Sequence, residues 1–287
     1  MSAAGKGPSL VILAGGRARR YGGVKPLAPV GPHGEAVIDL VASDAVAAGF
    51  GTVVLVLGPS TGPAIRYHVE RTWPTSVDVR FALQEAPLGT VHAVLSASDH
   101  VGDTPYGVGN ADDIYGQAAC ALLARHLSGT EPSNALVGYL LANAIVGPAA
   151  VTRGICRVGA EGQLLGVDER RQVSATGDGA FTSADGLQPA QLPPDARVSM
   201  NLWGFTPAFH QTLRAAMAAA TGASEDAEVL LPEVVAGALD SAPFSVLPTA
   251  DRCIGVTHPE DLPLVQAELN RQVGRGERAA RLWAAAG

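Results

Sequence analysis

The chain has 287 residues, 47% of them hydrophobic, and a formal net charge of −7. This length and composition allow a sizeable core within one large domain, and the acidic balance excludes binding of nucleic acid through a broad basic face. The three cysteines, Cys120, Cys156 and Cys253, lie far apart without Cys-x-x-Cys spacing, so they indicate neither a disulfide framework nor a zinc site, and we expect a reducing, cytoplasmic setting.

Apolar runs typical of strands alternate with helical patterns through the first half of the chain. The strand-like runs are 10–14, 52–57, 77–83 and 105–109, and the helical patterns cover about 36–48, 61–72, 90–99 and 114–127. Such alternation predicts βαβ units and therefore an α/β fold with a mainly parallel sheet. The first apolar run is too short for a signal sequence or a membrane span, so we expect no membrane association.

The second half is less regular. Strand-like runs at 135–141, 154–158 and 243–248 are joined by helical patterns at 207–220, at 226–239 and from about 259. The polar, Gly- and Pro-containing stretch 172–196 is predicted to form a long loop or excursion. The Arg- and Ala-rich tail 271–287 is either a frayed helix or a homo-oligomer contact through Leu282 and Trp283, and the sequence leaves both open.

The most informative segment is the loop that follows the first strand. It begins at Gly15 and ends at Lys25-Pro26, and it contains several glycines and arginines. Glycine lets backbone N–H groups approach an anion, and Arg17, Arg19, Arg20 and Lys25 supply positive charge around it. Since ligands of parallel sheets bind at the carboxyl ends of the strands, we interpret this loop as a phosphate site. The alternative is a surface turn with solvated arginines.

The residues Leu13-Ala-Gly-Gly-Arg-Ala-Arg-Arg20, followed by Lys25-Pro26, resemble the signature of the sugar nucleotidyltransferase (NDP-sugar pyrophosphorylase) family, to which glucose-1-phosphate thymidylyltransferases and GDP-mannose pyrophosphorylases belong. One departure is Ala18, where the family usually has Gly. The resemblance implies a Rossmann-like, three-layer α/β/α fold of the nucleotide-diphospho-sugar transferase type. It also implies that Leu13, Ala14, Gly15 and Gly16 bind a nucleotide and that Arg20 and Lys25 are catalytic.

A second segment, Gln84-Glu-Ala-Pro-Leu-Gly-Thr-Val-His-Ala93, opens a helix after the third strand-like run. It resembles a family segment in which the Gln amide reads the edge of the base and the Gly lets the base lie against the backbone. The resemblance therefore implies that Gln84, Pro87, Gly89 and Thr90 bind the nucleotide. An amide offers both a donor and an acceptor, so the base stays open. A role for Thr90 as a helix cap is compatible with the same residues.

The strand-like run at 105–109 leads into a pair of carboxylates, Asp112 and Asp113. Mg²⁺ prefers one or two carboxylate oxygens together with phosphate oxygens and water. The resemblance implies that Asp112 is catalytic and binds Mg²⁺, with Asp113 beside it. A helix cap is the alternative explanation for such a pair.

The segment 251–262 resembles another family motif but has Gly255 where a second metal-binding Asp normally stands. This departure leaves three explanations. Either Asp251 or Asp113 supplies the second carboxylate, or Asp112 and phosphates hold the metal alone, or activity has been lost.

Three further segments, 151–155, 166–169 and 198–205, resemble the part of the family that binds the sugar phosphate. They imply roles there for Gly154, Glu169 and Asn201. Glu169 stands next to two arginines, so an exposed ion pair of little energetic value is the alternative for that residue.

The resemblance extends from residue 10 to about 265. It implies a single nucleotidyltransferase domain over 1–270, with a nucleotide-binding half at 8–130 and a sugar-phosphate-binding half at 131–265, followed by the tail at 271–287. The implied reaction transfers NMP from an NTP to a sugar 1-phosphate or a related phosphate, such as a cyclitol phosphate or phosphocholine, and releases pyrophosphate. The alternative is a catalytically silent, nucleotide-binding regulatory subunit of the same fold.

Overall fold

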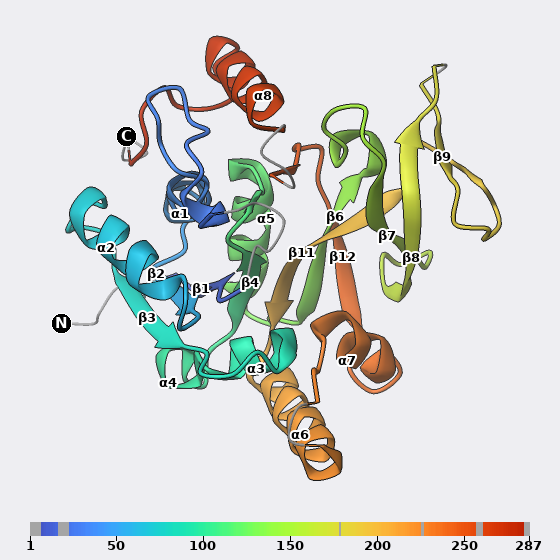
Figure 1. The fold of residues 1–287 in the computed structure, drawn as a ribbon. Helices are drawn as coiled ribbons and strands as arrows, with labels where there is room; N and C mark the ends of the chain where they lie inside the picture. Colours follow the sequence, from blue (N-terminus) through green and yellow to red (C-terminus); the bar gives the residue numbers. More distant parts are fainter. Residues whose placement is uncertain (1–6, 17–22, 178, 225–226, 257–260, 284–287) are drawn as a thin grey trace.

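A computed structural model describes residues 7–16, 23–177, 179–224, 227–256 and 261–283. Most of its strands join one mixed sheet, in the order β10-β9-β8-β7-β11-β4-β1-β2-β3, with β6 and β12 attached beside β11 (Figure 1). The strands are β1 (Ser9–Ala14), β2 (Thr52–Leu57), β3 (Val79–Leu83), β4 (Tyr106–Asn110), β6 (Asn134–Leu140), β7 (Val151–Val158), β8 (Leu164–Ala175), β9 (Phe181–Ser183), β10 (Gln191–Leu192), β11 (Arg197–Phe205) and β12 (Phe244–Pro248).

The core strands β3, β2, β1 and β4 are parallel, as the alternation of strands and helices predicts. Side chains along a strand point alternately to opposite faces, so Leu10 and Ile12 enter one hydrophobic cluster whereas Val11 enters the other. Helices cover both faces, which confirms the three-layer α/β fold. They are α1 (Val37–Ala47), α2 (Gly62–Thr72), α3 (Gly89–Leu95), α4 (Ser98–Val101), α5 (Gln117–Leu127), α6 (Pro207–Ala223), α7 (Leu231–Ala238) and α8 (Leu262–Gly274).

Beyond β4 the sheet becomes antiparallel. Strand β11 pairs antiparallel with β4, β6 and β7. In this part of the sheet, only β12 of the described strands runs parallel to a neighbour, which is β6. Strands β8, β9 and β10 continue the sheet outward and form the projection at one side of the molecule (Figure 1).

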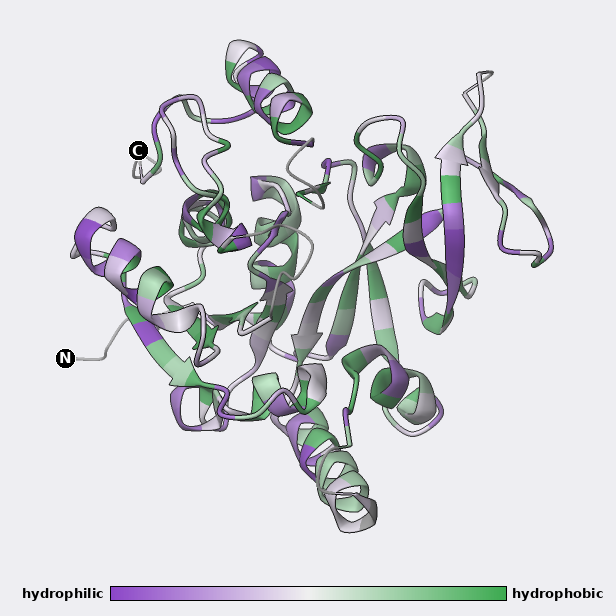
Figure 2. Ribbon diagram, viewed as in Figure 1, coloured by the Kyte–Doolittle hydropathy of each residue, from purple (hydrophilic) through white to green (hydrophobic). Residues whose placement is uncertain are grey.

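The prediction of a long loop over 172–196 is wrong, because this stretch contains the end of β8 and the strands β9 and β10. Along β8, buried residues are interspersed among exposed ones, and Figure 2 shows that much of this strand is hydrophilic. An antiparallel strand with one solvated face carries few apolar residues, so its sequence resembles that of a loop. Buried Arg170 helps to hold the projection together through Asp185, with Nε and Oδ2 2.8 Å apart.

The remaining helical predictions hold with shifted boundaries. The pattern at 90–99 is divided between α3 and α4, and the helix expected at 226–239 begins at Leu231. At the start of the helix expected at 114–127, residues Asp113–Ile114 instead form β5, which pairs with β13 (Ile254–Gly255). Among the described residues, no helix has the length and apolar character needed to cross a membrane.

Candidate functional site

The first candidate site is a cavity of about 600 Å³, here called the loop cavity, at the carboxyl ends of β1 and β4. Its lining includes Leu13, Gly15, Gly16, Gln84, Pro87, Gly89, Thr90 and Asp112. Eight residues predicted to bind nucleotide or to act in catalysis therefore surround one space. Ala14 is buried beside them, whereas Arg20, with the other loop arginines and Ala18, lies outside the described residues.

Two glycines, Gly15 and Gly58, lie where segments beside the loop cavity approach one another, and the approach of backbone to backbone requires glycine at Gly58. A Cβ atom on Gly15 would lie 2.6 Å from Oε1 of Gln84, and one on Gly58 would lie 2.6 Å from the Gly15 carbonyl oxygen. The Gln84 amide also donates from Nε2 to the carbonyl of Gly89 at 3.0 Å. This hydrogen bond holds the Gln84 amide against the start of α3.

Thr90 does not cap its own helix. The N-cap position of α3 is Leu88, without a side-chain hydrogen bond, and the Thr90 hydroxyl accepts a hydrogen bond from the Leu231 N–H at 2.8 Å. Gly89 has a φ of +90°, and a Cβ atom there would collide with the carbonyl of Val229. The start of α3 is thus joined to the segment before α7, which forms one wall of the loop cavity through Glu228 and Leu230.

Lys25 and Asp112 form an ion pair at the edge of the loop cavity, with Nζ and Oδ2 2.6 Å apart. Lys25 begins a short 3₁₀ helix, Lys25–Leu27, whose second residue is Pro26. Both side chains retain some exposure, at 17% and 33%. Because both side chains stay partly exposed, the Lys25 ammonium can contact an anionic ligand and the Asp112 carboxylate can contact a cationic one.

Asp113 has a different environment from its neighbour. Its Oδ2 accepts a hydrogen bond from Asn110 Nδ2 at 2.9 Å. Burial, and secondly the negative charge of Asp112, raise the pKa of Asp113 to about 6. Gly255 pairs with Asp113 in the β5–β13 ladder, and a Cβ atom on Gly255 would lie 2.6 Å from Asp113 Oδ1. The Asp113 carboxylate therefore occupies space that a side chain at position 255 would need.

The predicted metal residues are not all brought together. Asp251 accepts a hydrogen bond from the backbone N–H of Ala119, at 2.7 Å, and so caps the first turn of α5. No cluster of three or more His, Cys, Asp or Glu side chains suited to a metal occurs among the described residues. Asp112 and Asp113 remain as two adjacent carboxylates, and this donor set fits Mg²⁺, which commonly takes one or two carboxylates and completes its shell with phosphates and water.

A second cavity, of about 280 Å³ and here called the β7 cavity, contains the residues predicted to bind the sugar phosphate. It is lined by Asp113, Thr152, Arg153, Gly154, Val167, Glu169, Ser199, Met200, Asn201 and Pro232. Glu169 also pairs with Arg171, with Oε1 and Nε 2.9 Å apart, and both side chains are exposed. The structure thus contains the exposed ion pair and places Glu169 at the cavity as well.

Asn201 has an unusual backbone conformation within a strand. Its φ is +59°, and the pairing of β11 with β6 becomes irregular between Ser199 and Trp203. Asparagine adopts this left-handed region more readily than most non-glycine residues, so the local interruption of the strand suits its side chain. Asn201 lines both the β7 cavity and a third, apolar cavity of about 210 Å³.

The sequence interpretation missed two parts of this site. Arg153 lines the β7 cavity immediately before Gly154, and its position within the segment 151–155 was the available signal. Leu230 and Pro232 enter from the start of α7, and no local pattern marks them, because only packing against α3 brings them to the site.

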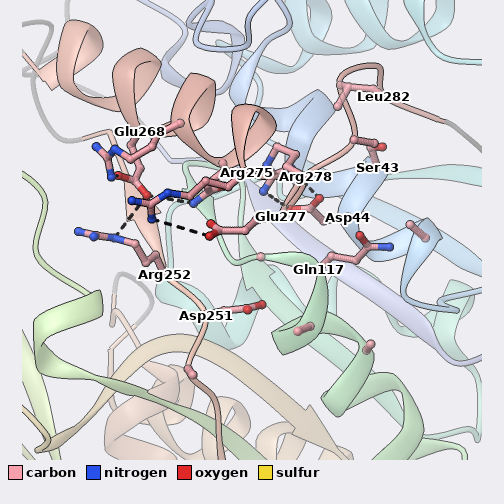
Figure 3. Close-up of a pocket in the computed structure, with 18 of the residues that line it drawn as sticks. Ser43, Asp44, Gln117, Asp251, Arg252, Glu268, Arg275, Glu277, Arg278 and Leu282 are labelled. Atoms are coloured by element: carbon pink, nitrogen blue, oxygen red, sulfur yellow. Dashed lines mark hydrogen bonds and ion pairs between the residues drawn. The ribbon is translucent and has the colours of Figure 1, made fainter.

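A further cavity lies away from both of these sites. This C-terminal cavity, of about 680 Å³, lies among α1, α5, α8 and the segment after α8 (Figure 3). Its lining includes Asp251 but no other predicted site residue. Several arginines surround it, and Arg278 points toward Asp44 with Nη1 and Oδ1 2.7 Å apart (Figure 3).

Comparison with known proteins gives two similarities. A match to the MobA-like NTP transferase domain covers residues 10–177. Glucose-1-phosphate thymidylyltransferase of Mycolicibacterium smegmatis is 28% identical over 168 residues, which represent 56% of this chain and 54% of that protein. The chain thus spans about half the length of the curated relative that it matches.

Proposed function

Since this chain belongs to the MobA-like NTP transferase family, we propose that it transfers a nucleoside monophosphate from an NTP to a sugar 1-phosphate and releases pyrophosphate. The observation that carries this proposal is that the three cavities are adjacent. The apolar cavity shares Leu13, Thr90, Asn110 and Leu230 with the loop cavity and Asn201 and Pro232 with the β7 cavity. Two substrates bound in these spaces meet beside Asp112 and Asp113.

In this proposal the loop cavity takes the nucleotide. Gln84 lies against the base, and the glycine-lined end of β1 directs the phosphates toward Lys25. Arg20 belongs to the same loop, and we assign to it the stabilisation of the departing pyrophosphate. Leu13, Ala14, Pro87, Gly89 and Thr90 shape the rest of the nucleotide site.

The β7 cavity takes the acceptor, whose phosphate oxygen attacks the α-phosphorus in line. This nucleophile is already anionic near neutral pH, so no side chain needs to remove a proton. Gly154, Glu169 and Asn201 position the acceptor, and Lys25 neutralises phosphate charge. Asp112 and Asp113 would hold Mg²⁺, which when bound supplies positive charge at the phosphates. Catalysis then rests on placement and charge stabilisation.

Pyrophosphate release tests the proposal. Purified protein with Mg²⁺ is offered each common NTP and dTTP, together with hexose 1-phosphates, cyclitol phosphates and phosphocholine. Release that requires one nucleotide and one acceptor supports the reaction and identifies both substrates. Nucleotide binding by calorimetry without release from any pair supports the silent regulatory subunit instead.

Substitution of Asp112 provides the residue-level test. We expect Asp112→Asn and Lys25→Met to lower kcat by about 10²-fold or more, the usual effect of losing one preorganised charge contact. Asp195→Asn is the matched control, since Asp195 lies exposed in a turn. Near-normal turnover by folded Asp112→Asn protein contradicts its assignment.

A further inference from the structure

Arg153, on β7, is a mostly buried cation whose hydrogen bonds are all to neutral groups. Its Nε and Nη2 donate to the carbonyl of Ala144, at 2.8 and 2.6 Å, and its Nη1 donates to the carbonyl of Thr152 at 2.8 Å. It makes no ion pair with any carboxylate in the described part of the chain. Burial lowers the pKa of Arg153 from its usual value, so the protein bears a cost for keeping this charge here.

Two arginines with deeply buried side chains, Arg170 and Arg278, are paired directly with carboxylates, whereas Arg197 donates only to the backbone carbonyls of Gly138 and Thr249. Arg170 lies 2.8 Å from Asp185 and Arg278 lies 2.7 Å from Asp44, in each case with a side-chain exposure below 10%. Buried charges are normally paired, because desolvation without a counter-ion is costly. Arg153 makes no such direct pair among the described residues, although the charge of Asp113, which lines the same cavity, acts on it.

The position of Arg153 indicates where such a counter-ion would bind. Arg153 lines the β7 cavity together with Asp113 and Glu169 and is the cation in that lining. Glu169 is already paired with Arg171, and Asp113 accepts the Asn110 amide. A guanidinium has five N–H donors, and the three hydrogen bonds to carbonyls leave two of them for a ligand.

We propose that Arg153 binds the phosphate of the acceptor and selects phosphorylated over neutral acceptors. This inference rests on the proposed nucleotidyl transfer. The planar guanidinium suits phosphate oxygens, and its anchoring to two backbone carbonyls holds it in place. Because Asp113 lines this cavity and Asp112 lines the loop cavity, a phosphate at Arg153 would lie next to the proposed nucleotide site.

The kinetic test compares Arg153→Gln and Arg153→Lys with the wild type, using the acceptor identified by pyrophosphate release. We expect Arg153→Gln to raise the acceptor KM by about 30-fold, as for loss of a charged hydrogen-bonding partner, while the NTP KM changes less than about threefold. Arg153→Lys keeps the charge and should recover part of the loss. Arg157→Gln is the control, since Arg157 is on the same strand, 59% exposed and paired with Asp168.

A purely structural role for Arg153 predicts a different result. Loss of its hydrogen bonds to the carbonyls would then lower Tm and kcat in both variants without a selective change in acceptor KM. An unchanged acceptor KM in folded Arg153→Gln protein overturns the proposal. If this variant does not fold, Arg153→Met removes the same charge, and an unchanged acceptor KM in folded Arg153→Met protein overturns the proposal.

A binding experiment separates this inference from the proposed function. Inorganic phosphate is titrated calorimetrically into wild type and Arg153→Gln, with the loop cavity saturated by a non-hydrolysable NTP analogue. We expect the wild type to bind phosphate and the variant to bind it at least about tenfold more weakly. Arg153-dependent phosphate binding without nucleotidyl transfer leaves the anion site standing and rejects the reaction. If transfer occurs but neither the acceptor KM nor phosphate binding depends on Arg153, the proposed reaction stands and the anion site is rejected.

Discussion

At the residue scale, the hydrogen bonds of His210 determine its protonation state. The hydroxyl of Ser98 donates to the carbonyl of Leu95, so its oxygen accepts from His210 Nε2, 3.0 Å away. The other ring nitrogen, Nδ1, then accepts from the Tyr106 hydroxyl at 2.7 Å. Burial, and secondly the charge of Arg214, lower the pKa of His210, although Asp103 opposes them. The hydrogen bonds and the lowered pKa therefore both favour the neutral form of His210 in the folded protein.

This arrangement predicts a loss of stability in mild acid. The unfolded chain binds a proton at His210 as pH falls through about 6.5, whereas the folded protein resists protonation. The free energy of unfolding should then decrease below pH 6.5 by at most about 1.4 kcal/mol per pH unit from this residue. Urea unfolding from pH 7.5 to 5.0 measures it, and His210→Gln should show a shallower decrease. Equal slopes in the two proteins would argue against a neutral His210.

At the element scale, the junction between α3 and the segment before α7 shapes the proposed nucleotide site. The N–H of Val91 donates to the carbonyl of Val229, and the N–H of Val229 donates to the carbonyl of Leu88. Gly89 lies between these bonds with a positive φ and no room for a Cβ atom. Two elements distant in the sequence are thus held at the separation that the loop cavity requires.

Replacement of Gly89 tests this junction. Gly89→Ala should lower the free energy of unfolding by about 2 kcal/mol, because alanine is strained at positive φ and would displace Val229. It should also weaken nucleotide binding, measured by calorimetry. Gly237→Ala is the matched control, since Gly237 lies within α7 with open space around it, and alanine favours a helix there by about 0.5–1 kcal/mol. Equal stability of the two variants would refute the role of Gly89.

At the scale of the whole molecule, the segment after α8 closes back onto the first helix. Arg278 makes a two-point ion pair with Asp44, with nitrogen–oxygen distances of 2.7 and 2.8 Å. The ring of Trp283 packs against Trp73, with centroids 5.2 Å apart, and the backbone N–H of Trp283 donates to the Ser43 hydroxyl. Residues 275–283 thus form turns against the domain rather than a frayed helix.

We expect removal of the Arg278–Asp44 ion pair to lower the stability of the folded protein substantially. Burial raises the pKa of Asp44, although Arg278 opposes this. Arg278→Ala would leave a buried carboxylate without its partner and should lower the free energy of unfolding by about 3 kcal/mol. Arg275→Ala, at a side chain that is 64% exposed, should change it by less than about 0.5 kcal/mol. Denaturant unfolding at pH 7 measures the change in the free energy of unfolding for both variants. Similarly small changes would show that the segment after α8 contributes little to stability.

The parts of this protein that the sequence determined are local. The strands β1 and β2 and the start of α1 follow from apolar runs and helix boundaries. The glycine-rich loop can be recognised as a candidate site because its signals lie within a dozen residues. The same holds for Gln84 and Asp112, which directly follow strands. In a parallel sheet the carboxyl ends of strands meet at one edge, so local patterns are enough to bring these residues together.

Only the tertiary structure decided the rest, because pairing between distant segments leaves no local pattern. The polar sequence of β8 to β10 resembles that of a loop, and only pairing in the sheet makes these segments strands. Asp251 and Asp113 were equivalent candidates in the sequence, and packing placed Asp251 at α5 and Asp113 in the space beside Gly255. The environment of Arg153 likewise depends on the tertiary structure, since the desolvation of its charge is set by what folding brings near it.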